Sequence, residues 1–325
     1  MSDLVVITDS DLGAEGIEEA ELGRAGVPVR RHACRTEDDV VAVVADARAL
    51  IVQWAPVTER ALDAAPRLCF ISRLGIGYDM IDVEAATARG IAVANTPDYC
   101  VEEVVAHTVA LVLALTRGVV AYDRSVRAGD WSAVGSYPGA ARPRDLVCGI
   151  VGLGRIGRPV ATALAGLGFR CLGVDPVVPA LAGVEPAELE TLLAASDVVT
   201  LHAPLAPETR HLIDAAALAR MRPGARLVNT CRGGLVDEQA LAAALSGGPL
   251  AGAALDVFES QPLPASSPLR GLESVILSPH AAWYSQTALA ELPRLAAAQV
   301  VDFLAGRAVP SIVNPDYRRH VPNAA

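Results

Sequence analysis

A chain of 325 residues is long enough for two domains, each with its own hydrophobic core. With 52% hydrophobic and 20% charged residues, it has the composition of an ordinary globular protein rather than a disordered or fibrous one. The formal net charge of −10 argues against a nucleic-acid partner, and the absence of any lysine excludes Schiff-base chemistry and a Walker-type phosphate lysine.

The first hundred residues alternate short β-rich runs with helical stretches. Alternating strands and helices predict a parallel sheet with helices on its faces. We expect strands at 4–9, 49–54, 68–73 and 91–96, with helices at 36–47 and 81–90 between them.

Residues 101–126 carry a long helical pattern with a broad apolar face. The stretch begins acidic and ends with arginines, as the helix dipole favours. We expect one helix that links two domains or forms a dimer interface. A fully internal interdomain helix is the alternative.

A loop rich in Gly, Ser and Pro at 130–144 precedes a second series of alternating strands and helices. Its strands are expected at 145–152, 169–175, 196–202, 225–230 and 250–257. A last amphipathic helix at 286–304, interrupted or started by Pro293, is expected to return to the first domain. The predicted fold is α/β, with two Rossmann-like or flavodoxin-like domains that each contain a parallel sheet. One domain, 99–286, is inserted into a discontinuous domain formed by 1–98 and 287–325.

The six cysteines are scattered, with no CxxC pair and no Cys/His cluster. Small buried thiols in a reducing cytoplasm are the simplest interpretation, and we expect no metal site. The N-terminus has no basic segment before its short apolar run, and nowhere is there an unbroken apolar stretch of membrane-spanning length. We therefore expect a cytoplasmic protein without a membrane partner.

Gly152, Gly154 and Gly157 form a GxGxxG pattern directly after an apolar run and at the start of a helical one. In that context the glycines allow a tight turn, and the helix N-terminus offers free N–H groups to a pyrophosphate. Asp175 ends the next predicted strand, where a carboxylate accepts hydrogen bonds from the adenosine ribose and repels a 2′-phosphate. The pattern therefore predicts NAD rather than NADP. A structural glycine turn and an aspartate that caps a turn before Pro176 are the alternatives.

Four further segments occur in a fixed order: LHAPLAPETRHLI from Leu201, MRPGARLVNTCRGGLVDEQAL from Met221, AGAALDVFESQP from Ala251 and SPHAAWYS from Ser278. Together with RLGIGYDMID and the glycine pattern, they resemble the D-isomer-specific 2-hydroxyacid dehydrogenases over most of the chain. VEE in the long helix and the HAAWYS segment resemble the branch that contains the C-terminal-binding-protein corepressors.

The resemblance implies hydride transfer between NAD and a 2-keto or D-2-hydroxy acid, with two principal catalytic residues. Arg232 matches the family residue that holds the substrate carboxylate and polarises the keto oxygen, since a guanidinium stays charged when desolvated. His280 matches the family acid/base and has an ordinary pKa near neutrality. A surface salt bridge for Arg232 and a structural role for His280 are the alternatives.

The chain departs from the family pattern at Gln261. Most members have there a glutamate that hydrogen-bonds the histidine, whereas Glu259 of this chain occupies a different slot. A neutral amide stabilises the imidazolium form less than a carboxylate does. We therefore expect keto-acid reduction to favour acidic pH, or oxidation to be the working direction. Formate dehydrogenases of the superfamily also carry glutamine at this place.

The resemblance also assigns binding residues. Backbone N–H groups of Leu74, Gly75, Ile76 and Gly77 would bind the substrate carboxylate. Arg73 and Trp283 would face the substrate, although domain-interface packing is the alternative for Trp283. Together, Arg73 and Arg232 leave a phosphonate- or phosphate-bearing keto acid open. Cofactor contacts fall on Arg155, Ile156, Pro204, Thr209, Cys231, Asp256 and His280. Cys231 would lie near the nicotinamide ribose, or be an inert buried thiol, and Asp256 would bond the carboxamide.

The function expected from these residues is that of an NAD-dependent dehydrogenase of small 2-keto and D-2-hydroxy acids, active as a homodimer. An NAD(H)-sensing dimeric binding protein with little turnover is the alternative. Gln261 supports that alternative, whereas the presence of Arg232, His280 and Trp283 together argues against it.

Overall fold

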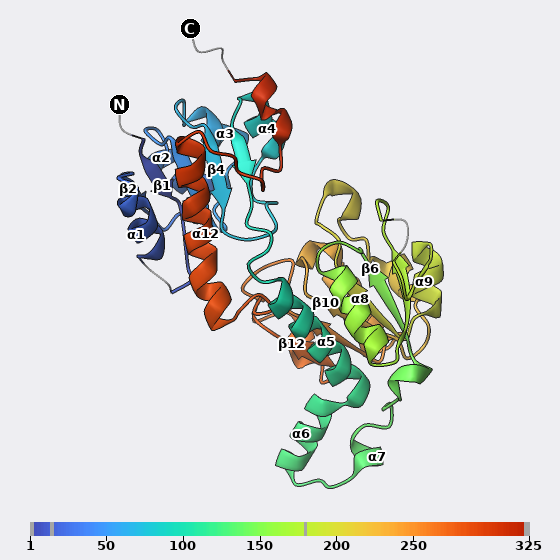
Figure 1. The fold of residues 1–325 in the computed structure, drawn as a ribbon. Coiled ribbons are helices and arrows are strands. Elements are labelled where there is room, and N and C mark those ends of the chain that lie inside the picture. Colours follow the sequence, from blue (N-terminus) through green and yellow to red (C-terminus); the bar gives the residue numbers. More distant parts are fainter. Residues whose placement is uncertain (1–2, 14–15, 179–180, 322–325) are drawn as a thin grey trace. The chain divides into compact units, whose positions relative to one another are not determined.

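The computed structural model describes residues 3–13, 16–178 and 181–321. The chain divides into two compact units, one formed by 1–100 with 284–325 and the other by 101–283. Each unit contains one sheet in which all strand pairs are parallel (Figure 1), which confirms the predicted fold class.

The first unit has a five-stranded sheet in the order β2-β1-β3-β4-β5. Its strands are β1 (Val5–Ile7), β2 (Val29–Arg31), β3 (Ala49–Val52), β4 (Phe70–Arg73) and β5 (Ala92–Ala94). Its helices are α1 (Ile17–Arg24), α2 (Glu37–Val43), α3 (Glu59–Asp63), α4 (Val83–Ala88) and α12 (Gln286–Leu304). Two apolar clusters show that α1 and α12 cover one face of the sheet, while α2, α3 and α4 cover the other. The helix predicted at 286–304 is present over that whole range, with Pro293 inside it.

The second unit has a seven-stranded sheet in the order β12-β11-β10-β9-β6-β7-β8. Its strands are β6 (Val147–Val151), β7 (Arg170–Val174), β8 (Val184–Pro186), β9 (Val198–Leu201), β10 (Arg226–Asn229), β11 (Gly252–Leu255) and β12 (Val275–Leu277). Its helices are α5 (Val101–Arg117), α6 (Val119–Ala128), α7 (Ala133–Ser136), α8 (Gly157–Gly166), α9 (Leu189–Ala195), α10 (Ala215–Arg220) and α11 (Glu238–Ser246). One apolar cluster joins the sheet to α5 and α8, and another joins it to α9, α10 and α11.

The strand order of the second unit indicates which edge of its sheet is suited to bind a ligand. β6 lies between β7 and β9, so the chain leaves β6 in one direction and later returns on the other side. In open parallel sheets ligands bind at the carboxyl ends of the strands beside such a reversal. Residues after β6, β9, β10 and β11 are therefore brought to one edge.

The prediction of one helix over 101–126 was wrong. The helix is interrupted at Gly118, and the axes of α5 and α6 are bent by 58° relative to each other. Gly118 has φ +67°, and a Cβ there would lie 2.4 Å from ring carbons of Tyr137. The 130–144 segment, expected as loop, contains the one-turn helix α7 and a short 3-10 turn at Pro143–Asp145.

No single helix among the described residues combines the length and apolarity needed to cross a membrane, and only the bent pair α5 and α6 meets those two criteria together.

Candidate active site

The turn after β6 leaves no room for a side chain at Gly157, where α8 begins. A Cβ on Gly157 would lie 1.9 Å from the carbonyl oxygen of Gly152, so α8 can begin this near the strand only with glycine. At Gly154 a Cβ would meet no protein atom within 4 Å. The backbone of Gly154 is therefore open to a close-lying ligand, and the N-terminus of α8 adds N–H groups and its dipole. Arg155 and Ile156 lie between these two glycines.

Asp175 follows β7 and lines a cavity, and its carboxylate is hydrogen-bonded to backbone N–H groups beside that cavity. Its Oδ2 accepts the N–H of Leu153 at 2.7 Å, and its Oδ1 accepts those of Val177 and Val178. Partial burial alone would raise the pKa of Asp175, but these N–H groups and the charge of Arg158 lower it below its ordinary value. The carboxylate is thus ionised. It caps a turn, as the alternative predicted, and it also borders the cavity, while its bond to an adenosine ribose stays a prediction.

The cavity beside Asp175 has a volume of about 520 Å³. Its walls include the apolar residues Leu153, Val174, Pro176, Leu181 and Pro186. The acidic residues Asp175 and Glu188 also line it. A mostly apolar wall with carboxylates beside it suits a nucleoside whose base is covered and whose ribose hydroxyls reach an acceptor. The residues present therefore fit the adenosine part of NAD.

The loop after β9 carries Pro204 and is closed by Thr209. The Thr209 hydroxyl donates to Pro204 O at 2.7 Å and accepts the N–H of Ala206 at 2.8 Å. Thr209 thus fixes the loop that presents Pro204. The loop also contains His202, which sequence reasoning did not single out. Burial lowers the pKa of its imidazole to about 3, so it is neutral at ordinary pH.

Arg232 follows β10 in a turn that Asn229 fixes. The Asn229 amide donates to Arg232 O at 2.8 Å, and its oxygen accepts the N–H of Cys231 at 3.0 Å. The Cys231 thiol donates to Ala203 O at 2.8 Å, which ties this turn to the loop after β9. Arg232 is half-buried, and its own guanidinium donates to Cys231 O.

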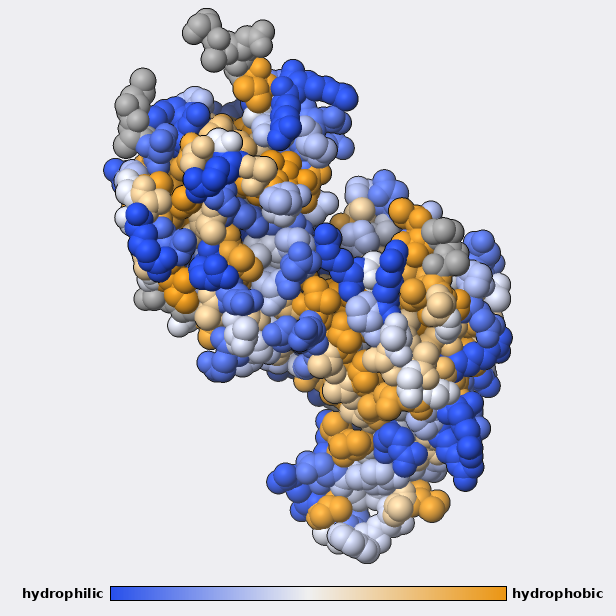
Figure 2. All heavy atoms as spheres, in the orientation of Figure 1, coloured by the Kyte–Doolittle hydropathy of each residue, from blue (hydrophilic) through white to orange (hydrophobic). Residues whose placement is uncertain are grey.

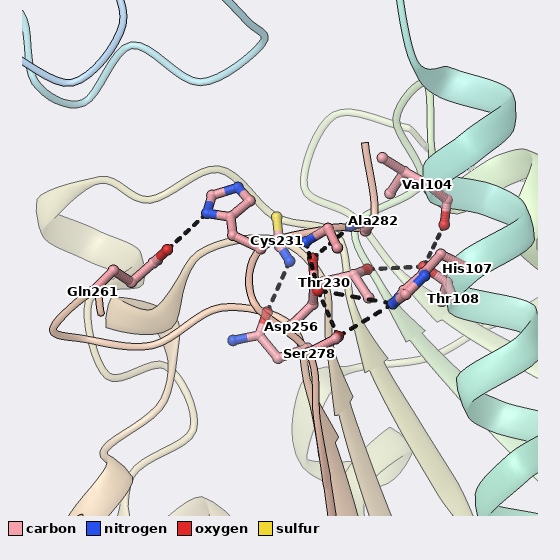
Figure 3. Close-up of polar contacts among 12 residues, drawn as sticks. Val104, His107, Thr108, Thr230, Cys231, Asp256, Gln261, Ser278 and Ala282 are labelled. Atoms are coloured by element: carbon pink, nitrogen blue, oxygen red, sulfur yellow. Dashed lines mark hydrogen bonds and ion pairs between the residues drawn. The ribbon is translucent and has the colours of Figure 1, made fainter. Parts of the chain in front are cut away.

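His280 is held in the left-handed backbone region, at φ +54°, by the residues around Asp256. Asp256 is fully buried; Oδ1 accepts the Ser278 hydroxyl and the N–H of Ala281, and Oδ2 accepts the N–H of Ala282. The N–H of His280 itself donates to Asp256 O at 2.8 Å. Asp256 therefore anchors the turn that carries His280 (Figure 3), in addition to the carboxamide contact implied by the resemblance.

Gln261 is hydrogen-bonded to the His280 ring, and a dashed line at the labelled Gln261 in Figure 3 marks this bond. The Gln261 amide nitrogen donates to Phe258 O at 3.3 Å, which turns its oxygen toward the imidazole. His280 Nδ1 lies 2.8 Å from Gln261 Oε1 and must be the protonated donor, because an amide oxygen only accepts. Nε2 is therefore the nitrogen at which His280 can gain or release a proton.

The first unit presents Arg73 and the following loop at the carboxyl edge of its sheet. The Arg73 side chain is buried, its guanidinium lies 5.2 Å from the ring centre of Trp54, and NH1 occupies the space where a Cβ of Gly75 would stand. The Trp54 loop is fixed by Asp9, whose carboxylate accepts the N–H groups of Gln53, Trp54 and Ala55. Sequence reasoning missed both Trp54 and Asp9.

Of the four backbone N–H groups predicted to bind the substrate carboxylate, those at 74–77, two already have acceptors within the protein. Leu74 donates to Val52 O and Gly75 to Arg73 O, so these two N–H groups are already engaged. Within the described ranges, the N–H groups of Ile76 and Gly77 donate to no backbone carbonyl. Trp283 is half-buried at the end of the second unit.

The second unit therefore brings together, around one sheet edge, the glycine turn, Asp175, Pro204, Cys231, Arg232, Asp256, Gln261 and His280. Sequence reasoning missed the residues that contact these turns. They are His107 and Thr108 on α5, and Asn229, Thr230 and Ser278 just before Arg232 and His280. Ser278 stands two residues before His280 in a quoted segment, but nothing in the sequence indicates its bond to Asp256. In the part of the chain that the structure describes, no group of three or more His, Cys, Asp or Glu side chains is arranged to hold a metal ion.

A glycine turn between strand and helix, an ionised carboxylate after the next strand and an Arg and a His at the same edge of a doubly wound sheet are typical of nicotinamide-dependent oxidoreductases. The family model for the D-isomer specific 2-hydroxyacid dehydrogenase, NAD binding domain, matches residues 109–282. The chain belongs to this family.

Two relatives extend the similarity. A glyoxylate reductase of Korarchaeum cryptofilum is 42% identical over 268 residues, 80% of this chain and 80% of the relative. A D-3-phosphoglycerate dehydrogenase of Mycobacterium tuberculosis is also 42% identical over 289 residues, 85% of this chain. The chain spans about half of that relative, 53% of its length.

A solved structure has the same fold. It is a D-lactate dehydrogenase from Aquifex aeolicus complexed with NAD and lactic acid, with a TM-score of 0.83 and 28% identity. The similarity covers 93% of this chain and 96% of that one. These names favour an enzyme over the NAD(H)-sensing alternative, whereas the corepressor branch stays a prediction.

Proposed function

We propose that this chain reduces a small 2-keto acid to the D-2-hydroxy acid with NADH, and catalyses the reverse reaction with NAD. The observation that carries the proposal is the His280–Gln261 pair on the Asp256 turn, at the same sheet edge as the glycine turn and Arg232. The first unit is proposed to bind the substrate and the second to bind NAD.

Bound NADH supplies the hydride that adds to C2 of the keto acid. His280, protonated at Nε2, gives its proton to the substrate oxygen as that oxygen gains negative charge, so the product is an alcohol. Gln261 holds Nδ1–H and thereby keeps Nε2 facing outward. Arg232 is proposed to bind the substrate carboxylate and stabilise charge on the oxygen. Gln261 offers a neutral acceptor, so the imidazolium forms only at lower pH than beside a glutamate.

In the first unit, Ile76 and Gly77 are proposed to donate their N–H groups to the substrate carboxylate. The buried Arg73 guanidinium is proposed to lie beside the substrate, and Trp283 to pack on its side chain. Arg73 and Arg232 are each proposed as a cationic group for an anionic substrate, which keeps a phosphate-bearing 2-keto acid among the candidates.

The first experiment follows NADH oxidation with glyoxylate and with aliphatic, aromatic, dicarboxylic and phosphate-bearing 2-keto acids, across pH. Arg232→Ala is expected to lower kcat/KM by at least about a hundredfold, because it removes a charged contact to the substrate. Arg220→Ala, which removes an exposed arginine from α10, is the matched control and is expected to change nothing. Tight NADH binding without turnover of any acid would contradict the proposal.

We also infer a homodimer. No residue of α6 is buried in this chain. Val119, Val126, Trp131 and Val134 are 57%, 52%, 89% and 79% exposed. Figure 2 shows apolar side chains among hydrophilic ones at this end of the second unit. A second copy would cover these side chains, and their burial would stabilise the dimer.

A cytoplasmic location is also proposed and is supported by six free cysteines.

A further inference from the structure

Two neighbouring residues of α5 each reach one of the two turns that carry the proposed catalytic side chains. His107 lies 3.3 Å from the hydroxyl of Ser278, two residues before His280. Thr108 lies 2.8 Å from the hydroxyl of Thr230, two residues before Arg232. Figure 3 shows both pairs, with α5 on one side and the two turns on the other.

The hydrogen-bond directions along the His107 branch are fixed. The single Ser278 hydroxyl proton goes to Asp256 Oδ1 at 2.5 Å, so the Ser278 oxygen accepts from His107 Nε2–H. The same His107 nitrogen lies 3.8 Å from Asp256 Oδ1. His107 thus points an N–H toward a fully buried carboxylate that in turn holds Ala281 and Ala282.

The Thr108 branch is equally directed. The Thr108 hydroxyl donates to Val104 O, one turn back along α5, at 2.7 Å. Its oxygen therefore accepts the Thr230 hydroxyl proton. Thr108 is fully buried and Thr230 is 8% exposed, so loss of either hydroxyl would leave a buried polar group without its partner.

α5 is suited to hold both turns because it is itself fixed by packing. Leu111, Val112 and Leu115 are buried in the apolar cluster that also contains residues of β6, β10 and β11. Small displacements of catalytic groups cost large factors in rate, so a rigid element behind both turns would matter for turnover.

We propose that His107 and Thr108 are positioning residues, His107 for His280 through Ser278 and Asp256, and Thr108 for Arg232 through Thr230. The inference rests on the proposed roles of Arg232 and His280. It assigns a functional task to the first helix of the second unit, which contributes no side chain to the proposed site.

The Thr108 branch is tested by Thr108→Val, which keeps the shape but removes the hydroxyl. We expect kcat/KM for the 2-keto acid to fall about tenfold, mainly through KM, because Arg232 is displaced. Thr116→Val is the matched control. Thr116 is also buried on α5 and also donates to the carbonyl four residues back, but within the described residues its hydroxyl bonds only to carbonyls of its own helix. Thr108→Ser should restore activity, and equal effects of Thr108→Val and Thr116→Val would overturn this branch.

The His107 branch is tested by His107→Leu beside His107→Gln, since glutamine can replace the Nε2–H donor. We expect kcat to fall about tenfold in the leucine variant, with KM within about twofold, and to recover in the glutamine variant. Equal kinetics for leucine and wild type would overturn this branch.

Nuclear magnetic resonance of the His280 ring and the Arg232 Nε–H group separates failure of positioning from failure of the proposed function, because it needs no turnover. The His280 signal should move in His107→Leu and the Arg232 signal in Thr108→Val, and neither should move in Thr116→Val. Unmoved signals would reject the positioning roles. Moved signals in a protein that turns over no keto acid would retain positioning and reject the proposed function.

Discussion

Two single residues, Gln261 and His202, are uncharged at positions where a charge would change the pH dependence of the protein. Gln261 offers His280 an uncharged acceptor, and its orientation is set by Phe258 O. His202, beside the glycine turn, is kept neutral by burial. Gln261 therefore leads to a prediction about the pH dependence of activity, and His202 to one about the pH dependence of stability.

Gln261→Glu is expected to extend keto-acid reduction to higher pH. A carboxylate at this position stabilises the imidazolium of His280, so the fall of kcat/KM on the alkaline side should move up by roughly one pH unit or more. The measurement is kcat/KM for reduction at constant ionic strength from pH 5 to 9. Gln261→Asn, which stays neutral, is the control. Identical profiles for wild type and Gln261→Glu would contradict the expected role.

His202 predicts a loss of stability in acid. Unfolded histidine binds a proton near pH 6.5, whereas folded His202 does so only at about 3. Between these values the unfolded state binds more protons, so the free energy of unfolding decreases as pH falls from 6.5 toward 3. By pH 5 the decrease reaches up to about 2 kcal/mol. In His202→Gln this component should vanish, as urea unfolding at pH 7 and pH 5 would report. Parallel pH dependences in the two proteins would refute it.

At the scale of elements, the break between α5 and α6 shows how tertiary contacts override a helical pattern. The apolar spacing continues past Gly118, so the hydrophobic pattern does not predict the 58° bend between α5 and α6. The Tyr137 ring occupies the place of a side chain at 118, and its hydroxyl both donates to Leu115 O and accepts from Arg226. The strands that were not predicted, β2, β8 and β12, have three residues each and lie at sheet edges, where pairing rather than periodicity defines a strand.

Gly118→Ala is expected to lower the free energy of unfolding by about 2–4 kcal/mol. The methyl group meets the Tyr137 ring, and the positive φ adds strain. Gly129→Ala is a matched control, since Gly129 has φ +99° but open space around it, and it should cost only about 1–2 kcal/mol. Chemical denaturation of both variants measures the difference. Equal losses would show that the ring contact does not matter.

At the scale of the whole molecule, the exposed apolar side chains of α6 and α7 predict self-association. Trp131→Glu combined with Val134→Glu should convert the dimer to a monomer in sedimentation velocity, because two charges would be placed in the interface. Leu167→Glu, at an exposed apolar position after α8, should leave the dimer intact. A wild-type protein that sediments as a monomer would refute the inferred dimer.

The amino-acid sequence was sufficient to predict the fold class and the family, both of which are confirmed. It also predicts the catalytic pair of the proposed site and the unusual Gln261, and these stay predictions. These follow from local signals: apolar period, a glycine turn between strand and helix, and motifs a few residues long. The residues that hold the turns of the proposed site became visible only in the folded protein. Asn229 anchors the Arg232 turn from only three residues away, whereas the anchoring of the His280 turn by Asp256 and the contacts from His107 and Thr108 join residues distant in sequence. Such contacts depend on which strands become neighbours, and a linear pattern does not contain that information.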